Sequence, residues 1–113
     1  LCVNNTITNT TFQGISLGGG DPNTRVLTRL TNNTLVNNQA GSSVLFGSDA
    51  FLGIVASGNS AATYQFINVD ADAAQTQVEV FGAAGASFLG RNAGALSITG
   101  TITDVAAGSL GIP

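Results

Sequence analysis

Hydrophobic and polar residues alternate along several stretches of this 113-residue chain, and a period of two predicts β-strands rather than helices. The clearest case is the stretch ALSITGTITDV, in which apolar or small residues occupy one face and hydroxyl residues occupy the other. The first face consists of Leu96, Ile98, Gly100 and Ile102. A half-buried strand is therefore expected there.

Shorter runs give the same indication. Residues 25–30 alternate so that Arg25 and Arg29 share the outer face of a strand. Residues 62–69 place Tyr64 and Phe66 together on one face. Residues 76–81 point Val78 inwards and Glu79 outwards. Residues 44–55 predict two short strands, of which AFLGIVA is expected to be buried on both faces.

Clusters of Gly and Asn separate these runs at intervals of about 8 to 15 residues, a spacing typical of all-β domains. Helical signals are limited to single turns at residues 70–75 and 107–113, and no internal repeat of solenoid type is identified. We therefore expect an all-β fold, namely a single antiparallel β-sandwich of jelly-roll or immunoglobulin-like form with an extended N-terminal strand.

The opening stretch LCVNNTITNTTFQG contains no charged side chain and few apolar ones. Val3 and Ile7 are expected on one face of this strand, with Phe12 beyond them. The expected organisation is an N-terminal arm (residues 1–13), a Gly-rich hinge (14–24) and a sandwich body (25–113). The arm is either the edge strand of its own sandwich or an assembly strand that pairs with a neighbouring copy, and the terminal position and hinge favour the second.

Charged residues make up only 8% of the chain, against about 25% in ordinary soluble domains. The net charge is −3, and Lys, His, Met and Trp are absent. Sheet proteins usually protect their edge strands with Lys, Pro or inward-pointing charges. Because Lys is absent and the two prolines lie in a turn and at the last residue, association with other copies is predicted. Contacts that do not close would give a homopolymer.

The same composition argues against several functions. Three arginines are too few for a nucleic-acid surface, and the longest apolar run is too short for a membrane span. Without His or Lys the common general bases are missing, so no enzyme activity, metal or cofactor is expected. One alternative stays open, a weak calcium site at Asp70 and Asp72 completed by Asp104 or Asp49. The GGGDPNT stretch (residues 18–24) lacks the Lys of a phosphate-binding loop and is interpreted as a turn.

Two kinds of modification are suggested by short motifs. Asn4, Asn9 and Asn32 each begin an Asn-X-Thr sequon and are candidates for N-glycosylation in an exported protein. Cys2 is the only cysteine, so an internal disulfide is excluded. The open interpretations for Cys2 are an intermolecular disulfide, a free thiol or a lipidated residue.

The uncharged Gly-, Ala-, Thr- and Asn-rich composition with a terminal ribbon resembles the subunits of secreted filaments built by strand exchange, such as archaeal threads and bacterial pilus or spore-appendage subunits. The chain departs from spore-appendage subunits in having the single Cys2. The resemblance implies a structural subunit, without cofactor, of an extracellular or cell-surface filament that polymerises by inserting its N-terminal strand into a neighbour. The alternatives are a virion structural protein, such as a tail-tube, decoration or fibre domain, and a carbohydrate-binding adhesin domain with glycans as partners.

Overall fold

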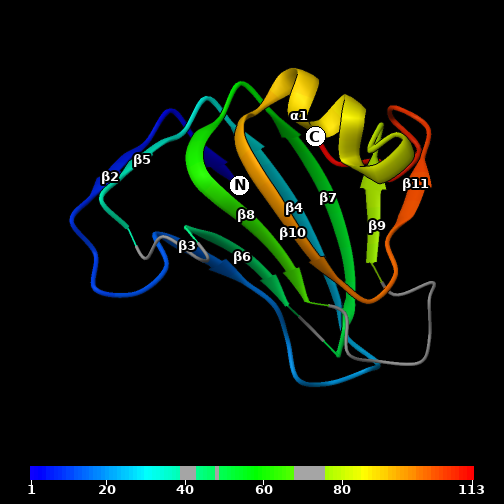
Figure 1. Cartoon of the computed structure of the whole chain (residues 1–113). Helices are drawn as coiled ribbons and strands as arrows, with labels where there is room; N and C mark the ends of the chain where they lie inside the picture. The colour runs from blue at the N-terminus through cyan, green and yellow to red at the C-terminus, as the bar shows by residue number, and fades with distance from the viewer. Residues whose placement is uncertain (39–42, 48, 68–75) are drawn as a thin grey trace.

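The chain winds around a central core in successive circuits, and every described strand pair is parallel (Figure 1). The computed structural model describes residues 1–38, 43–47, 49–67 and 76–113. Within these ranges eleven strands form two sheets, accompanied by the short helix α1 (Ala86–Arg91) and the 3-10 turn Ala83–Gly85.

The two sheets are built from strands that come from successive circuits of the chain. The first sheet has the order β1 (Cys2–Val3), β4 (Arg25–Thr31), β7 (Phe51–Ser57), β9 (Thr76–Glu79) and β11 (Thr103–Val105). The second contains β2 (Thr6–Thr8), β5 (Thr34–Val36), β8 (Ser60–Ile67), β6 (Val44–Gly47), β3 (Ile15–Leu17) and β10 (Ala93–Thr99). Strand β8 is long enough to pair with β5 and then with β6 along one edge, and β10 pairs with it along the other.

Each circuit of the chain contributes strands to both sheets before it returns to the first, and we call one such circuit a coil. Strands β1, β2 and β3 form the first coil, and β4, β5 and β6 form the second. Cys2 pairs with Leu30, 28 residues later, and Leu27 pairs with Gly53, 26 residues later. This is a parallel β-solenoid, in which each coil contacts mainly the coils next to it.

The predicted antiparallel β-sandwich is therefore wrong. Alternation and turn spacing are shared by antiparallel sandwiches and parallel solenoids, so they do not distinguish between the two. The near-continuous apolar run AFLGIVA is typical of strands buried on both faces, as parallel strands usually are. In the structure, β7 is buried from Leu52 to Ala56, as the sequence predicted, and it lies between two parallel neighbours.

The N-terminal segment pairs within its own chain. Strand β1 pairs with β4, and β2 pairs with β5. Strand β3, inside the segment interpreted as a hinge, pairs with β6. Arm, hinge and body are thus consecutive parts of one solenoid, and the free strand required for insertion into a neighbour is already paired here.

The strands in the middle of the chain were correctly placed from the sequence, namely β4, β6, β7, β8 and β9. Val44–Gly47 and Phe51–Ser57 are two strands, and Arg25 and Arg29 share the outer face of β4. The single strand expected over ALSITGTITDV is wrong, because the chain bends at Gly100 and divides into β10 and β11, which belong to different sheets. The helical turn expected at residues 70–75 lies outside the described residues.

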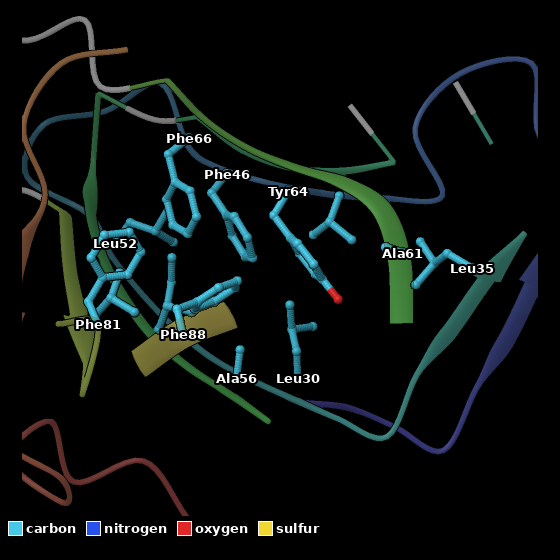
Figure 2. Packing of buried hydrophobic residues seen from close by; sticks show 13 residues of the cluster. Leu30, Leu35, Phe46, Leu52, Ala56, Ala61, Tyr64, Phe66, Phe81 and Phe88 are labelled. Carbon is cyan, nitrogen blue, oxygen red and sulfur yellow. The ribbon is translucent and has the colours of Figure 1, made fainter. Parts of the chain in front are cut away.

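Aromatic rings fill the interior between the two sheets (Figure 2). Phe46 and Phe66 are register partners on β6 and β8, and their rings stack at 4.5 Å. Phe88 of α1 points into the same space and meets Tyr64 and Phe66 edge-on. All four side chains are fully buried, so α1 closes part of the core that a further stretch of strand would otherwise cover.

The C-terminal segment after β11 turns back across the outer face of the first sheet. Glu79 of β9 accepts hydrogen bonds from the amides of Gly108 (2.8 Å) and Leu110 (3.0 Å). Arg29 of β4 donates to the carbonyl oxygens of Ile112 (2.9 Å) and Pro113. This cover explains why Glu79, expected on an exposed face, is almost completely buried.

Candidate functional site

A column of asparagines runs along one corner of the solenoid, where each coil passes from the first sheet to the second. Its members are Asn5, Asn33, Asn59 and Asn92, and the last three are buried. The backbone N–H and the side-chain Nδ2 of Asn33 both donate to Oδ1 of Asn59, at 3.0 and 2.9 Å. Asn5 bonds to Asn33, and Asn59 to Asn92, through the same pair of donors.

The second contact of each amide is equally regular. Nδ2 of Asn33 donates to the carbonyl of Cys2, and Nδ2 of Asn59 donates to that of Leu30. Nδ2 of Asn92 donates to the carbonyl of Ala56. In each case the acceptor lies three residues before the preceding asparagine of the column. Buried amides are stable only when their donors and acceptors are satisfied, and this pattern satisfies them coil after coil.

The residue before each of the first three asparagines has a left-handed backbone. These residues are Asn4, Asn32 and Gly58, with φ of 58°, 55° and 69°. Asn and Gly accept this conformation more readily than other residues, so the pair at the corner turns the chain sharply into the second sheet.

The asparagine column ends differently at its two extremities. At the C-terminal extremity, the carbonyl oxygen of Phe88 in α1 accepts from both the backbone N–H and Nδ2 of Asn92, so it replaces the next asparagine. At the other extremity, no described residue of a preceding coil donates to Oδ1 of Asn5. Helix α1 therefore caps the column at one end only.

The solenoid has two ends at which strand edges are left without a strand partner. At the N-terminal end, β1, β2 and β3 each pair with a single strand. At the C-terminal end, β11 pairs only with β9, and β10 pairs only with β8 among the described strands. Unpaired strand edges present backbone donors and acceptors that another chain can bind.

The apolar columns of the interior are also incomplete at these ends. Leu17, Phe46, Phe66 and Ile98 occupy matched positions of successive strands. Phe46 and Phe66, in the middle, are fully buried, whereas Leu17 is half-buried and Ile98 is 41% exposed. A parallel column contains Ile15, Val44, Tyr64 and Leu96, and here too only the two middle residues are fully buried.

Exposed apolar side chains are concentrated at the same two ends. In the described part of the chain, five of the seven large exposed apolar side chains belong to the first coil or to the α1–β10 region, and those five are Leu1, Val3, Phe12, Leu89 and Ile98. Residues 1–20 and 92–103 contain no charged side chain. Apart from Asp104 in β11, the strands at the two ends thus lack the charges that normally discourage edge-to-edge association.

The three residues proposed for the assembly strand lie at the N-terminal end but do not share a face. Ile7 of β2 packs against the core, and Val3 of β1 is partly exposed on the other sheet. Phe12 lies between β2 and β3 and is 70% exposed. The chain turns at Asn4 and Asn5, which separates Val3 from Ile7 and explains the difference from the prediction.

The sequon asparagines all lie at turns on the surface. Asn4, Asn9 and Asn32 are exposed and have positive φ. The Oδ1 atom of Asn9 accepts a hydrogen bond of 3.1 Å from Nδ2 of Asn37. Exposure is required for glycosylation, and whether any of the three carries a glycan stays a prediction.

Cys2 is half-buried at the N-terminal end of the asparagine column. Its Sγ lies 3.5 Å from Oδ1 of Asn33 and 3.3 Å from Nδ2 of Asn5. The thiol is free in this chain, so the intermolecular disulfide stays a prediction.

The acidic residues of the calcium alternative are not gathered into a site among the described residues. The carboxylate of Asp104 accepts from the amides of Phe81 (2.7 Å) and Gly82 (2.9 Å). Asp49 is exposed and lines an open groove of about 520 Å³ along with Ser16, Gly18–Gly20, Leu45, Gly47 and Ile67. Asp70 and Asp72 lie outside the described residues, and within those residues no group of three metal-ligating side chains occurs.

Tyr64 is the only tyrosine and is fully buried. Its hydroxyl donates to the carbonyl of Ala93 at 3.1 Å, and burial raises its pKa to about 12. It therefore offers no exposed ring on which a sugar could stack, so Tyr64 does not support the adhesin alternative.

The asparagine column was missed in the sequence because no repeat was identified, and that interpretation is wrong. The signal is present in NNTITN (residues 4–9) and NNTLVN (residues 32–37), which repeat after 28 residues and match in register. The next two turns, SGNS and RNAG (residues 57–60 and 91–94), retain only the column asparagine and a small residue after it.

Comparison of the chain with family models, with curated proteins and with solved structures gives no match. The described residues include no helix of the length and apolarity that a transmembrane segment needs. The functional argument therefore depends on the geometry of the solenoid and its two ends.

Proposed function

We propose that this protein is a structural subunit of a self-assembling extracellular or cell-surface filament, in which copies associate through the open ends of the solenoid. The observation that carries this proposal is the presence, at both ends, of strand edges with few charges and incompletely covered apolar columns. The proposal keeps the homopolymer predicted from the sequence. It replaces strand insertion with edge-to-edge pairing, because β1, β2 and β3 are already paired in their own chain.

Two physical terms favour such association. Pairing strand edges satisfies backbone groups, and covering the half-buried columns removes apolar surface from water, worth about 25 cal/mol per Å². The opposing electrostatic term is small, because the ends carry almost no charge. Since an association through two different ends does not close on itself, it extends into a filament.

The test compares two substitutions of similar local chemistry. Ile98→Lys puts a charge on the C-terminal end, and Val36→Lys puts one on the outer face of β5, which is not an edge strand. The two side chains are 41% and 47% exposed, so both lysines can reach water in the single subunit. Electron microscopy and sedimentation of the purified proteins measure assembly.

We expect filaments from the native chain and from Val36→Lys, and loss of filaments from Ile98→Lys with its folding unchanged by circular dichroism. A native chain that stays monomeric at high concentration would overturn the proposal. Equal assembly of both variants would show that the C-terminal end is not the contact surface.

A further inference from the structure

We infer that the copies stack head to tail in one defined register, with the N-terminal end of one copy on the C-terminal end of the next, so that Leu17 follows Ile98 and Ile15 follows Leu96. This inference rests on the proposed function and specifies the contact. It assigns β2 and β3 of one copy to the edge of β10 that no described strand pairs with.

The first support is the correspondence between the strands at the two ends. Strand β10 pairs directly with one edge of β8. Strands β2 and β3 are linked to the other edge of β8 through β5 and β6, so β10 and the strands β2 and β3 occupy matching positions along the coil. A second copy placed on the C-terminal end in the same orientation would continue the second sheet with parallel pairing.

The second support is the register of the interior columns. On β8, Tyr64 and Phe66 pair with Val44 and Phe46 on one side, and with Leu96 and Ile98 on the other. The first coil enters these columns as Ile15 and Leu17. A following copy in register therefore places Ile15 on Leu96 and Leu17 on Ile98, which would bury apolar side chains that are half-exposed in the single copy.

Disulfide trapping tests the register. Parallel strands lie about 4.8 Å apart, so cysteines at neighbouring positions of one column meet the geometric requirement for a disulfide. One sample mixes the Leu17→Cys and Ile98→Cys variants, and a second mixes Ile15→Cys with Leu96→Cys. The mismatched control mixes Ile15→Cys with Ile98→Cys, which the proposed register places two residues apart along the strand. Native Cys2 is kept, and mass spectrometry of the oxidised material identifies the linked residues.

We expect disulfides between positions 17 and 98 and between positions 15 and 96 in assembled material. We expect no disulfide between positions 15 and 98 in the mismatched mixture. Links of 98 to 98 or of 17 to 17 within assembled material would overturn head-to-tail polarity. A 15–98 link in place of 17–98 would overturn the register. In both cases filament formation, and with it the proposed function, would stand. If the native chain forms no assembly, both proposals fail together.

Discussion

At the scale of single residues, the asparagines of the corner column have the clearest structural role. A buried amide that loses its hydrogen-bond partner destabilises the fold by about 1–3 kcal/mol. Each asparagine of the column therefore stabilises the fold by bonding to the amide groups of its neighbours. Asn33 has asparagines on both sides, whereas Asn5 has one on one side only. The same residue type should therefore have unequal effects along the column.

We predict that Asn33→Ala lowers the free energy of unfolding by about 3 kcal/mol, because it removes partners from Asn5, Asn59 and the carbonyl of Cys2. Asn5→Ala, at the exposed end, should lower it by about 1 kcal/mol or less. Urea denaturation of both variants, under conditions that keep the chain monomeric, measures the difference. Equal losses would contradict the role assigned to the column.

Tyr64 gives a prediction about pH. Its pKa is raised to about 12 in the folded chain by burial, from 10.0 as the ordinary value, so the unfolded chain releases the phenol proton first. Between those two values the unfolded state binds fewer protons than the folded state, and the free energy of unfolding should fall as pH rises. The slope contributed by Tyr64 is at most about 1.4 kcal/mol per pH unit.

The control for this pH dependence is Tyr64→Phe, which keeps the ring and removes the titrating group. Urea denaturation at several pH values from neutral to strongly alkaline gives the two profiles. The native chain should lose stability in the alkaline range, and the variant should not show this contribution. Parallel profiles would mean that Tyr64 does not titrate differently on folding.

At the scale of elements, the sequence predicts where strands lie better than it predicts which strands pair. Alternation located β4, β8 and β9, and apolar runs located β6 and β7, because which side chains face the core depends on the local pattern. Which strands pair depends instead on contacts between residues one coil apart. The repeat that reports those contacts is clear only between the first two coils, since Gly58 and α1 replace it later.

The candidate functional site could likewise be predicted only in part from the sequence. The absence of residues that protect sheet edges and the lack of charge in the N-terminal stretch were both predicted from the composition. The N-terminal stretch forms one open end of the solenoid. The C-terminal end could not be found, because ALSITGTITDV gives no sign that Gly100 divides it between two sheets or that β10 has a free edge. Ile98 reads as a core residue in the sequence and is one by position, but no described coil follows it.

The C-terminal segment is an element whose attachment can be tested. Glu79 is buried and its carboxylate is held by the amides of Gly108 and Leu110. We predict that Glu79→Ala releases residues 106–113 and lowers the free energy of unfolding by about 2 kcal/mol, since two charge-assisted hydrogen bonds are lost. Limited proteolysis and hydrogen exchange of this segment report its release. Gln77→Ala, on the same face of β9, is the control and should leave the segment protected.

At the scale of the whole molecule, a solenoid differs from a sandwich in how its stability depends on its ends. Each coil is stabilised mainly by its neighbours, so a coil at an open end has half of its contacts. Residues 1–20 supply the first coil with only a few half-buried apolar side chains, including Ile7, Ile15 and Leu17. The single copy is therefore expected to be least stable at the ends where the proposed stacking would support it.

This weakness makes stability depend on concentration. Stacking binds the folded chain and not the unfolded one, so it should raise the thermal midpoint as protein concentration increases. We predict such a rise for the native chain and for Val36→Lys, and a constant midpoint for Ile98→Lys, whose lysine opposes contact at the C-terminal end. Differential scanning calorimetry over a hundredfold range of concentration measures the thermal midpoint.

Hydrogen exchange should also show that the amides of β1, β2 and β3 gain protection as concentration rises in the native chain, because the first coil is the part that a neighbour covers. A midpoint that stays constant for the native chain while filaments form would place the stabilising contacts outside the two ends.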